Sequence, residues 1–103
     1  MSDPTVVADW RTRIAYGEEG PRPTVVFEDD RVRVILGGLR AGQEIPEHPE
    51  AEAVYHFLEG AGTMLVDGAE LAVAAGTTVV VPAGGARGVR ARTDVAFLAT
   101  RIA

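Results

Sequence analysis

His48 lies in a short acidic segment and has the side chain best suited to chemistry. Residues 42–60 read GQEIPEHPEAEAVYHFLEG, so Glu50 and Glu52 follow His48 at spacings of two and four residues. An imidazole titrates near neutral pH and can act as a general base, and nearby carboxylates can assist it or bind a divalent cation. The segment therefore indicates acid–base chemistry, a weak metal site formed by His48, Glu50 and Glu52, or a solvated acidic loop.

Arg87 indicates a different kind of site. It lies in the segment 76–91, which reads GTTVVVPAGGARGVRA. A guanidinium stays charged and cannot bind a metal, but its planar donors match a carboxylate or a phosphate. Two interpretations follow. Either Arg87 pairs with Glu50 or Glu52 or points to solvent, or it holds the anionic group of a small ligand.

The composition excludes several other chemistries. The chain has no cysteine and no lysine, and its only serine is Ser2. Thiolate sites, Schiff-base lysines and serine nucleophiles are therefore excluded. The net charge of −5 without a basic cluster argues against nucleic acid as a partner. No apolar run is long enough for a membrane helix and no secretory signal is present, so we expect a cytoplasmic protein without a membrane partner.

Short apolar runs rich in β-branched residues must position these side chains. They predict strands and no sustained helix, which is typical of an all-β barrel or jelly roll. The expected strands are 24–27, 31–36, 54–58, 63–66, 69–73, 77–81, 89–92 and 95–102. Asp67-Gly68 predicts a type I′ hairpin. Gly37-Gly38 is expected to end its strand, and residues 41–52 are expected to form a loop.

A length of 103 residues fits one domain. We expect residues 1–23 to form a lead-in segment and residues 24–103 to form the barrel. Trp10 is the only tryptophan of the chain and is expected to anchor the lead-in segment by packing.

Residues 42–60 and 76–91 resemble the two motifs of the cupin family. The first segment carries the glycine, the histidine followed by proline, and the strand ending in LEG. In the second, Gly76, Pro82 and Gly84 match the spacing G-x5-P-x-G-x2-H-x3-N. The resemblance implies a small cupin-type β-barrel that holds a metal in its interior. Compact microbial cupins are usually homodimers, so the resemblance implies a homodimer here, and the apolar strand face around residues 32–36 fits such an interface.

The chain departs from the family at the metal ligands. His48 matches the second histidine of the first motif, whereas the other three ligand positions fall on Pro46, Ala53 and Arg87. Because a metal site needs three or four converging donors, we expect no metal cofactor. A divalent metal ion held weakly by His48, Glu50 and Glu52 is the alternative.

Strand alternation places the remaining candidates. If Ala53, Tyr55 and Phe57 face the interior, His56 faces away from it. The expected ligand-binding residues are therefore His48, Tyr55, Phe57 and Arg87. They predict a small-molecule-binding cupin with a degenerate metal site and an anionic metabolite as ligand. The alternatives are an isomerase, cyclase or dioxygenase that uses His48 and nearby carboxylates, and a structural protein in which Tyr55 and Phe57 fill the interior.

Overall fold

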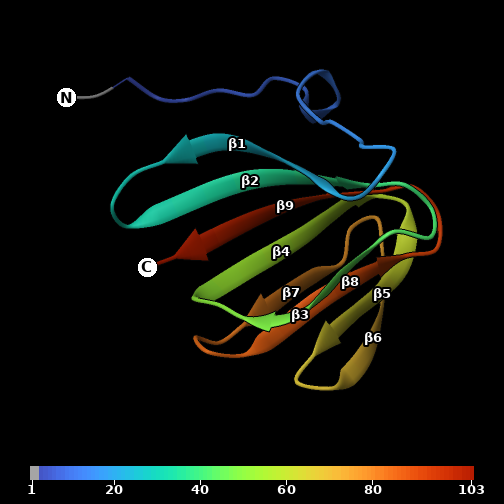
Figure 1. The fold of residues 1–103 in the computed structure, drawn as a ribbon. Helices are drawn as coiled ribbons and strands as arrows, with labels where there is room; N and C mark the ends of the chain where they lie inside the picture. Colours follow the sequence, from blue (N-terminus) through green and yellow to red (C-terminus); the bar gives the residue numbers. More distant parts are fainter. Residues whose placement is uncertain (1–2) are drawn as a thin grey trace.

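A computed structural model describes residues 3–103 as two stacked antiparallel sheets (Figure 1). The strands are β1 (Arg22–Glu28), β2 (Val32–Leu39), β3 (Glu44–Pro49), β4 (Glu52–Glu59), β5 (Ala61–Val66), β6 (Ala69–Ala74), β7 (Thr78–Val81), β8 (Ala86–Ala91) and β9 (Val95–Ile102). A five-stranded sheet has the order β1-β2-β9-β4-β7, and a four-stranded sheet has the order β3-β8-β5-β6. This jelly roll confirms the expected all-β fold.

The core lies between the inner faces of the two sheets. The buried apolar side chains there include Leu39, Phe57, Met64, Val89 and Phe97. Each sheet contributes alternate residues of its strands, because successive side chains of a strand point to opposite faces. No helix among residues 3–103 is long and apolar enough to cross a membrane.

The segment expected as the loop 41–52 contains a strand, and that expectation was wrong. β3 pairs with β8 and its register shifts between Ile45 and His48. Two prolines, Pro46 and Pro49, make this segment look unlike a strand in the sequence. However, β3 lies at an edge of its sheet, where a missing backbone N–H is tolerated. Gly88 of β8 lets the two backbones approach, since a Cβ there would lie 2.8 Å from the backbone nitrogen of Glu47.

The glycines 37 and 38 do not end their strand, which continues to Leu39. A Cβ at Gly37 would clash with the ring of Phe97, and a Cβ at Gly38 would clash with the backbone of Ala15. These glycines therefore serve close packing. By contrast, the Asp67-Gly68 hairpin is confirmed, with φ angles of 49° and 83° at its two central residues.

The described part of the lead-in segment contains one 3₁₀ turn, Trp10–Thr12, and its last two residues already belong to β1, which begins at Arg22 rather than at residue 24. The half-buried Trp10 lines a groove together with Leu36 and Leu58 from the outward side of the five-stranded sheet. The Nε2 of Gln43 donates a hydrogen bond to the carbonyl of Gly17 at 2.7 Å and holds this segment to the body of the fold, whereas the anchoring role of Trp10 stays a prediction.

Candidate functional site

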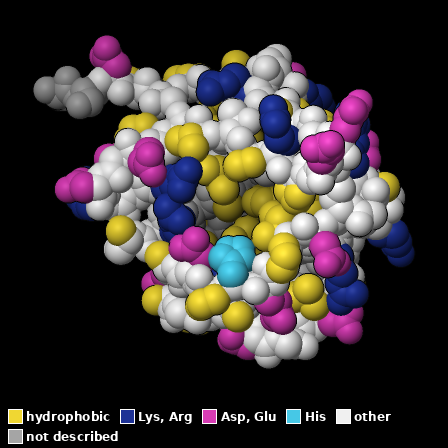
Figure 2. Space-filling model, viewed as in Figure 1, with side chains coloured by type: hydrophobic (Ala, Val, Ile, Leu, Met, Phe, Trp, Pro, Cys, Tyr) yellow, Lys and Arg dark blue, Asp and Glu magenta, His cyan; other side chains and the backbone are white. Residues whose placement is uncertain are grey.

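A cavity of about 200 Å³ opens between the two sheets. Figure 2 shows it as a hollow with apolar side chains inside, and with charged side chains and a histidine around its rim. Its walls come from β2, β3, β4, β8, β9 and the connection between β3 and β4. The lining residues are Arg33, Ile35, Ile45, His48, Glu50, Ala53, Tyr55, Arg87, Phe97, Ala99 and Arg101.

The strand register arranges the wall of the five-stranded sheet in rows. Nearest the mouth, Arg101 of β9 lies opposite Arg33 of β2 and Ala53 of β4. In the next row, Ala99 lies opposite Ile35 and Tyr55. Directly paired residues of antiparallel strands share a face, so polar side chains gather at the mouth and apolar ones lie below them.

Arg87 enters the cavity from the other sheet. It lies opposite His48 in the pairing of β8 with β3, and it is 1% exposed. Its Nε donates a hydrogen bond to the carbonyl of Gly85 at 2.8 Å, and its Nη2 donates to the carbonyl of Glu50 at 3.3 Å. Its Nη1 is buried without a hydrogen-bond partner. Among residues 3–103 no carboxylate forms an ion pair with Arg87, so a buried positive charge stays uncompensated.

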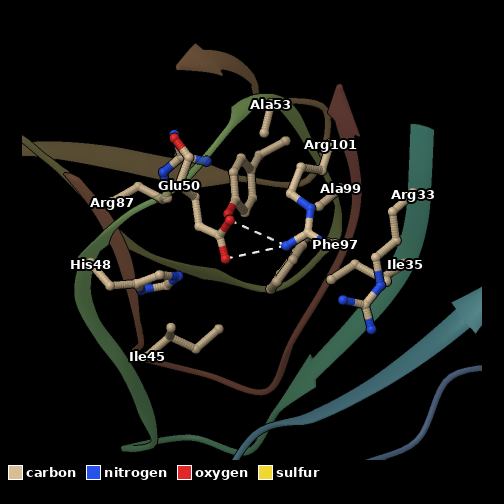
Figure 3. Close-up of a pocket in the computed structure, with 11 residues that line it drawn as sticks. Arg33, Ile35, Ile45, His48, Glu50, Ala53, Arg87, Phe97, Ala99 and Arg101 are labelled. Carbon is tan, nitrogen blue, oxygen red and sulfur yellow. Dashed lines mark hydrogen bonds and ion pairs between the residues drawn. The ribbon is translucent and has the colours of Figure 1, made fainter. Parts of the chain in front are cut away.

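Glu50 directs its carboxylate to Arg101 and not to Arg87. The Nη1 of Arg101 lies 3.2 Å from each oxygen of Glu50, and both side chains are 35% exposed (Figure 3). The ion pair between Arg87 and Glu50 that was one sequence interpretation is therefore not formed. The backbone of Glu50 contacts one guanidinium while its carboxylate contacts the other.

His48 presents one ring nitrogen to the protein backbone. Its Nδ1 lies 2.9 Å from the carbonyl oxygen of Pro46. A carbonyl can only accept, so this contact assigns the proton to Nδ1 and leaves a lone pair on Nε2. The ring lines the cavity beside Glu50 (Figure 3). His48 can therefore accept a proton or a hydrogen bond from a bound molecule.

The two aromatic candidates, Tyr55 and Phe57, lie in different surroundings: one at the cavity and the other in the core. Tyr55 lines the cavity, with its ring centroid 5.4 Å from that of Phe97. Phe57 is 1% exposed, packs against Phe97 at 5.8 Å and is not among the lining residues. It lies in the core, one row below Tyr55. His56 is exposed on the opposite face and contacts the hydroxyl of Thr78 at 2.7 Å, so the expected alternation along β4 is confirmed.

The donors around the cavity do not fit a divalent cation. His48 and Glu50 are the lining residues with metal-binding side chains, and the carboxylate of Glu50 is paired with Arg101. Glu52 is exposed and shares the outward face of β4 with His56. Within residues 3–103 no three His, Cys, Asp or Glu side chains come together as a metal site requires. The guanidinium of Arg87 would also repel a cation.

Six lining residues were missed from the sequence: Arg33, Ile35, Ile45, Phe97, Ala99 and Arg101. Arg101 and Phe97 share the inward face of β9 with Ala99, and Arg33 shares that of β2 with Ile35. Alternation along the expected strand 95–102 already placed Phe97, Ala99 and Arg101 on one face. What was missing was the pairing partner of that strand.

The chain is similar to proteins of one family. The family model described as a cupin domain matches residues 31–101, and no curated protein matches. The fold is similar to a conserved protein of unknown function from Streptococcus pyogenes, with a TM-score of 0.84 and 22% identity over 98% of this chain and 90% of the other. A protein from Thermus thermophilus has a TM-score of 0.85 and 27% identity, over 93% of this chain and 96% of the other. An RmlC-like cupin protein from Desulfovibrio desulfuricans has a TM-score of 0.81 and 27% identity, over 99% of this chain and 96% of the other.

Proposed function

This chain belongs to the cupin domain family, and we propose that it binds a small organic carboxylate in the cavity between its sheets. Membership supports a small-molecule-binding or enzymatic protein in general. The choice of an anion rests on one observation. Among residues 3–103, Arg87 is buried at the cavity wall without a carboxylate to balance its charge, and its Nη1 has no hydrogen-bond partner.

A carboxylate would relieve a specific energetic cost. Burying an ion costs several kcal/mol unless a partner compensates it, and a buried donor without a partner costs about 1–3 kcal/mol. A ligand carboxylate that reaches Nη1 would offset part of these costs through a short, charge-assisted hydrogen bond, against the cost of desolvating the carboxylate itself. Arg87 is thus a preorganised donor that a bound anion would satisfy.

The mouth of the cavity favours the same ligand. Arg33 and Arg101 lie directly opposite each other on neighbouring strands, an arrangement of like charges that destabilises a sheet. The cavity is lined by these two arginines, by Arg87 and by one carboxylate, that of Glu50, so the formal charge of its lining is positive although the whole chain carries −5. Such a local field raises the rate at which anions are captured.

A second candidate function is acid–base catalysis on the bound carboxylate, as in an isomerase or a cyclase. It is favoured by the fixed tautomer of His48, whose Nδ1 contact leaves Nε2 free to accept a proton. A carboxylate held by Arg87 would lie against the strand that carries His48, because the two residues are paired across β3 and β8. Oxygen chemistry at a metal receives no such support from the donor set.

Titration calorimetry of small carboxylates tests the binding function. The wild-type protein is expected to bind members of the series, and Arg87→Met is expected to lose at least about tenfold in affinity, the equivalent of one charge-assisted hydrogen bond. Arg90→Met is the matched control, because Arg90 is the other arginine of β8 and, unlike Arg87, is exposed and pairs with Glu70 at the surface. Equal affinities of wild type and a folded Arg87→Met would overturn the proposal.

Proton exchange tests the catalytic candidate. In heavy water, the methyl hydrogens of bound pyruvate, whose removal leaves an enolate on the neighbouring keto group, are expected to exchange faster with wild-type protein than with His48→Gln, as seen by proton NMR. Exchange rates that do not change in His48→Gln, at full ligand occupancy, would leave binding as the function and remove His48 as a base.

A further inference from the structure

We infer that the ligand is a monocarboxylate with an apolar body the size of one six-membered ring, and this inference rests on the proposed function. Arg87 holds the carboxylate, the apolar wall holds the ring, and Glu50 disfavours a second negative charge.

The apolar part of the cavity (the slot) has walls from both sheets. Ile45 contributes from one sheet, and Ile35, Tyr55 and Phe97 contribute from the other. Two of the inward positions between them are alanines, Ala53 and Ala99. Ala99 lies opposite both Ile35 and Tyr55, so the hollow exists because a small residue stands in the middle of this row.

The volume limits the size of the ligand. An engineered cavity of about 150 Å³ lined by aliphatic and aromatic side chains holds benzene. The cavity of about 200 Å³ in this protein has room for such a ring and a carboxylate. A fused two-ring body would have to displace side chains from the wall, which is costly in a close-packed interior, or leave its second ring outside the mouth, where the apolar surface stays in contact with water. An acetate would fill little of the slot and leave apolar surface in contact with water.

The charges limit the ligand to one carboxylate. The carboxylate of Glu50 already occupies Arg101, at 3.2 Å from its Nη1. Arg33 is balanced by Glu28, whose Oε2 lies 3.3 Å from Nε in an ion pair without hydrogen-bond geometry. Arg87 is therefore the one cavity arginine of the described chain without a carboxylate partner. A second carboxylate on the ligand would compete with Glu50 for Arg101, and the negative charge of Glu50 would repel it.

A panel of probe compounds tests these limits by titration calorimetry. The panel is benzoate, cyclohexanecarboxylate, acetate, succinate, 2-naphthoate and benzamide. Benzoate and cyclohexanecarboxylate are expected to bind at least about tenfold more tightly than the other four, the effect expected when one further substantial interaction is made. Benzamide tests the charge, acetate and 2-naphthoate test the size, and succinate tests the second carboxylate.

Two variants separate the contributions of the wall. Ala99→Leu fills the slot and is expected to weaken benzoate at least about tenfold while leaving acetate within about twofold, because the carboxylate site is untouched. Ala99→Val is the smaller replacement if the leucine does not fold. Glu50→Gln removes the competing charge, and succinate is expected to gain at least about fivefold relative to benzoate.

The outcomes distinguish this inference from the proposed function. If acetate or succinate binds wild-type protein as tightly as benzoate, the ring-sized monocarboxylate is wrong but carboxylate binding stands. An equal loss of acetate and benzoate in Ala99→Leu would have the same meaning. If no carboxylate binds at all, the proposed function and this inference both fail.

Discussion

Replacing Arg87 by methionine is expected to change the stability of the ligand-free protein very little. Arg87 is 1% exposed and is among the largest fully buried side chains of the described chain, so a purely structural view predicts a large loss. The opposite expectation follows from its partners. They are two backbone carbonyls, and the charge is not part of any ion pair among residues 3–103.

The opposing contributions are of similar size. Two hydrogen bonds from a charged donor are lost, at about 1.5–3 kcal/mol each. The variant is relieved of a buried charge, which costs several kcal/mol, and of the unpartnered Nη1, which costs about 1–3 kcal/mol. The carbonyl of Glu50 keeps the backbone N–H of Gly84 at 2.8 Å as a donor, and methionine fills most of the vacated volume. The net change in the free energy of unfolding is therefore expected to stay within about 1.5 kcal/mol.

Urea denaturation of wild type, Arg87→Met and Arg90→Met without ligand measures this change. Arg90→Met removes an exposed ion pair and is expected to change the free energy of unfolding by about 0–1 kcal/mol. A loss of more than about 3 kcal/mol in Arg87→Met, the amount typical of breaking a buried ion pair, would refute the reasoning and make Arg87 a structural residue. With a carboxylate at about 100 times its wild-type Kd, wild type and Arg90→Met are both expected to gain about 2.7 kcal/mol, and Arg87→Met, which binds at least about tenfold more weakly, about 1.4 kcal/mol or less.

Three further predictions concern the scaffold. Asp94 has a pKa below its usual range because the backbone N–H of Ala41 donates a hydrogen bond to its carboxylate. Its contribution to stability is therefore present above about pH 4 and is lost as the pH falls through its folded pKa. Urea denaturation between pH 5 and 3 should show a larger loss in the free energy of unfolding for wild type than for Asp94→Asn. Gly37→Ala should lower the free energy of unfolding by about 1–3 kcal/mol in the same assay, because the added methyl group overpacks against Phe97. Gly20→Ala should be nearly neutral, because open space surrounds this glycine. Equal losses in the two variants would contradict the role of Gly37 in packing. The resemblance implies a homodimer, and its interface is expected on the outward side of the five-stranded sheet, where Val80 is 61% exposed. Light scattering should then show that the Val80→Arg variant is monomeric. A variant that stays dimeric would place the interface elsewhere.

The fold could be predicted from the sequence wherever local chemistry decides it. Asp67-Gly68 can hardly be anything but a tight turn, and the run 95–102 became β9 with the expected bounds. The failures depend on contacts between distant residues. Gly37 continues its strand because the ring of Phe97 packs on it, and β3 forms because Gly88 admits its backbone. Neither partner can be identified from the local sequence.

The candidate site was predicted in part for the same reason. The family spacing and strand alternation brought out His48, Tyr55 and Arg87, which all line the cavity. The role of Arg101 as the partner of Glu50 depends on how β9 is paired with β4, and this register is a tertiary property. The ligand-binding roles of the lining residues, and that of the core residue Phe57, stay predictions.

A crystal structure with the tightest-binding carboxylate of the panel tests the central claim most directly. The account predicts a carboxylate oxygen about 2.7–2.9 Å from the Nη1 of Arg87, with Glu50 still paired to Arg101. A complex in which the anion lies on surface arginines, and in which Nη1 of Arg87 stays without an anionic partner, would contradict it.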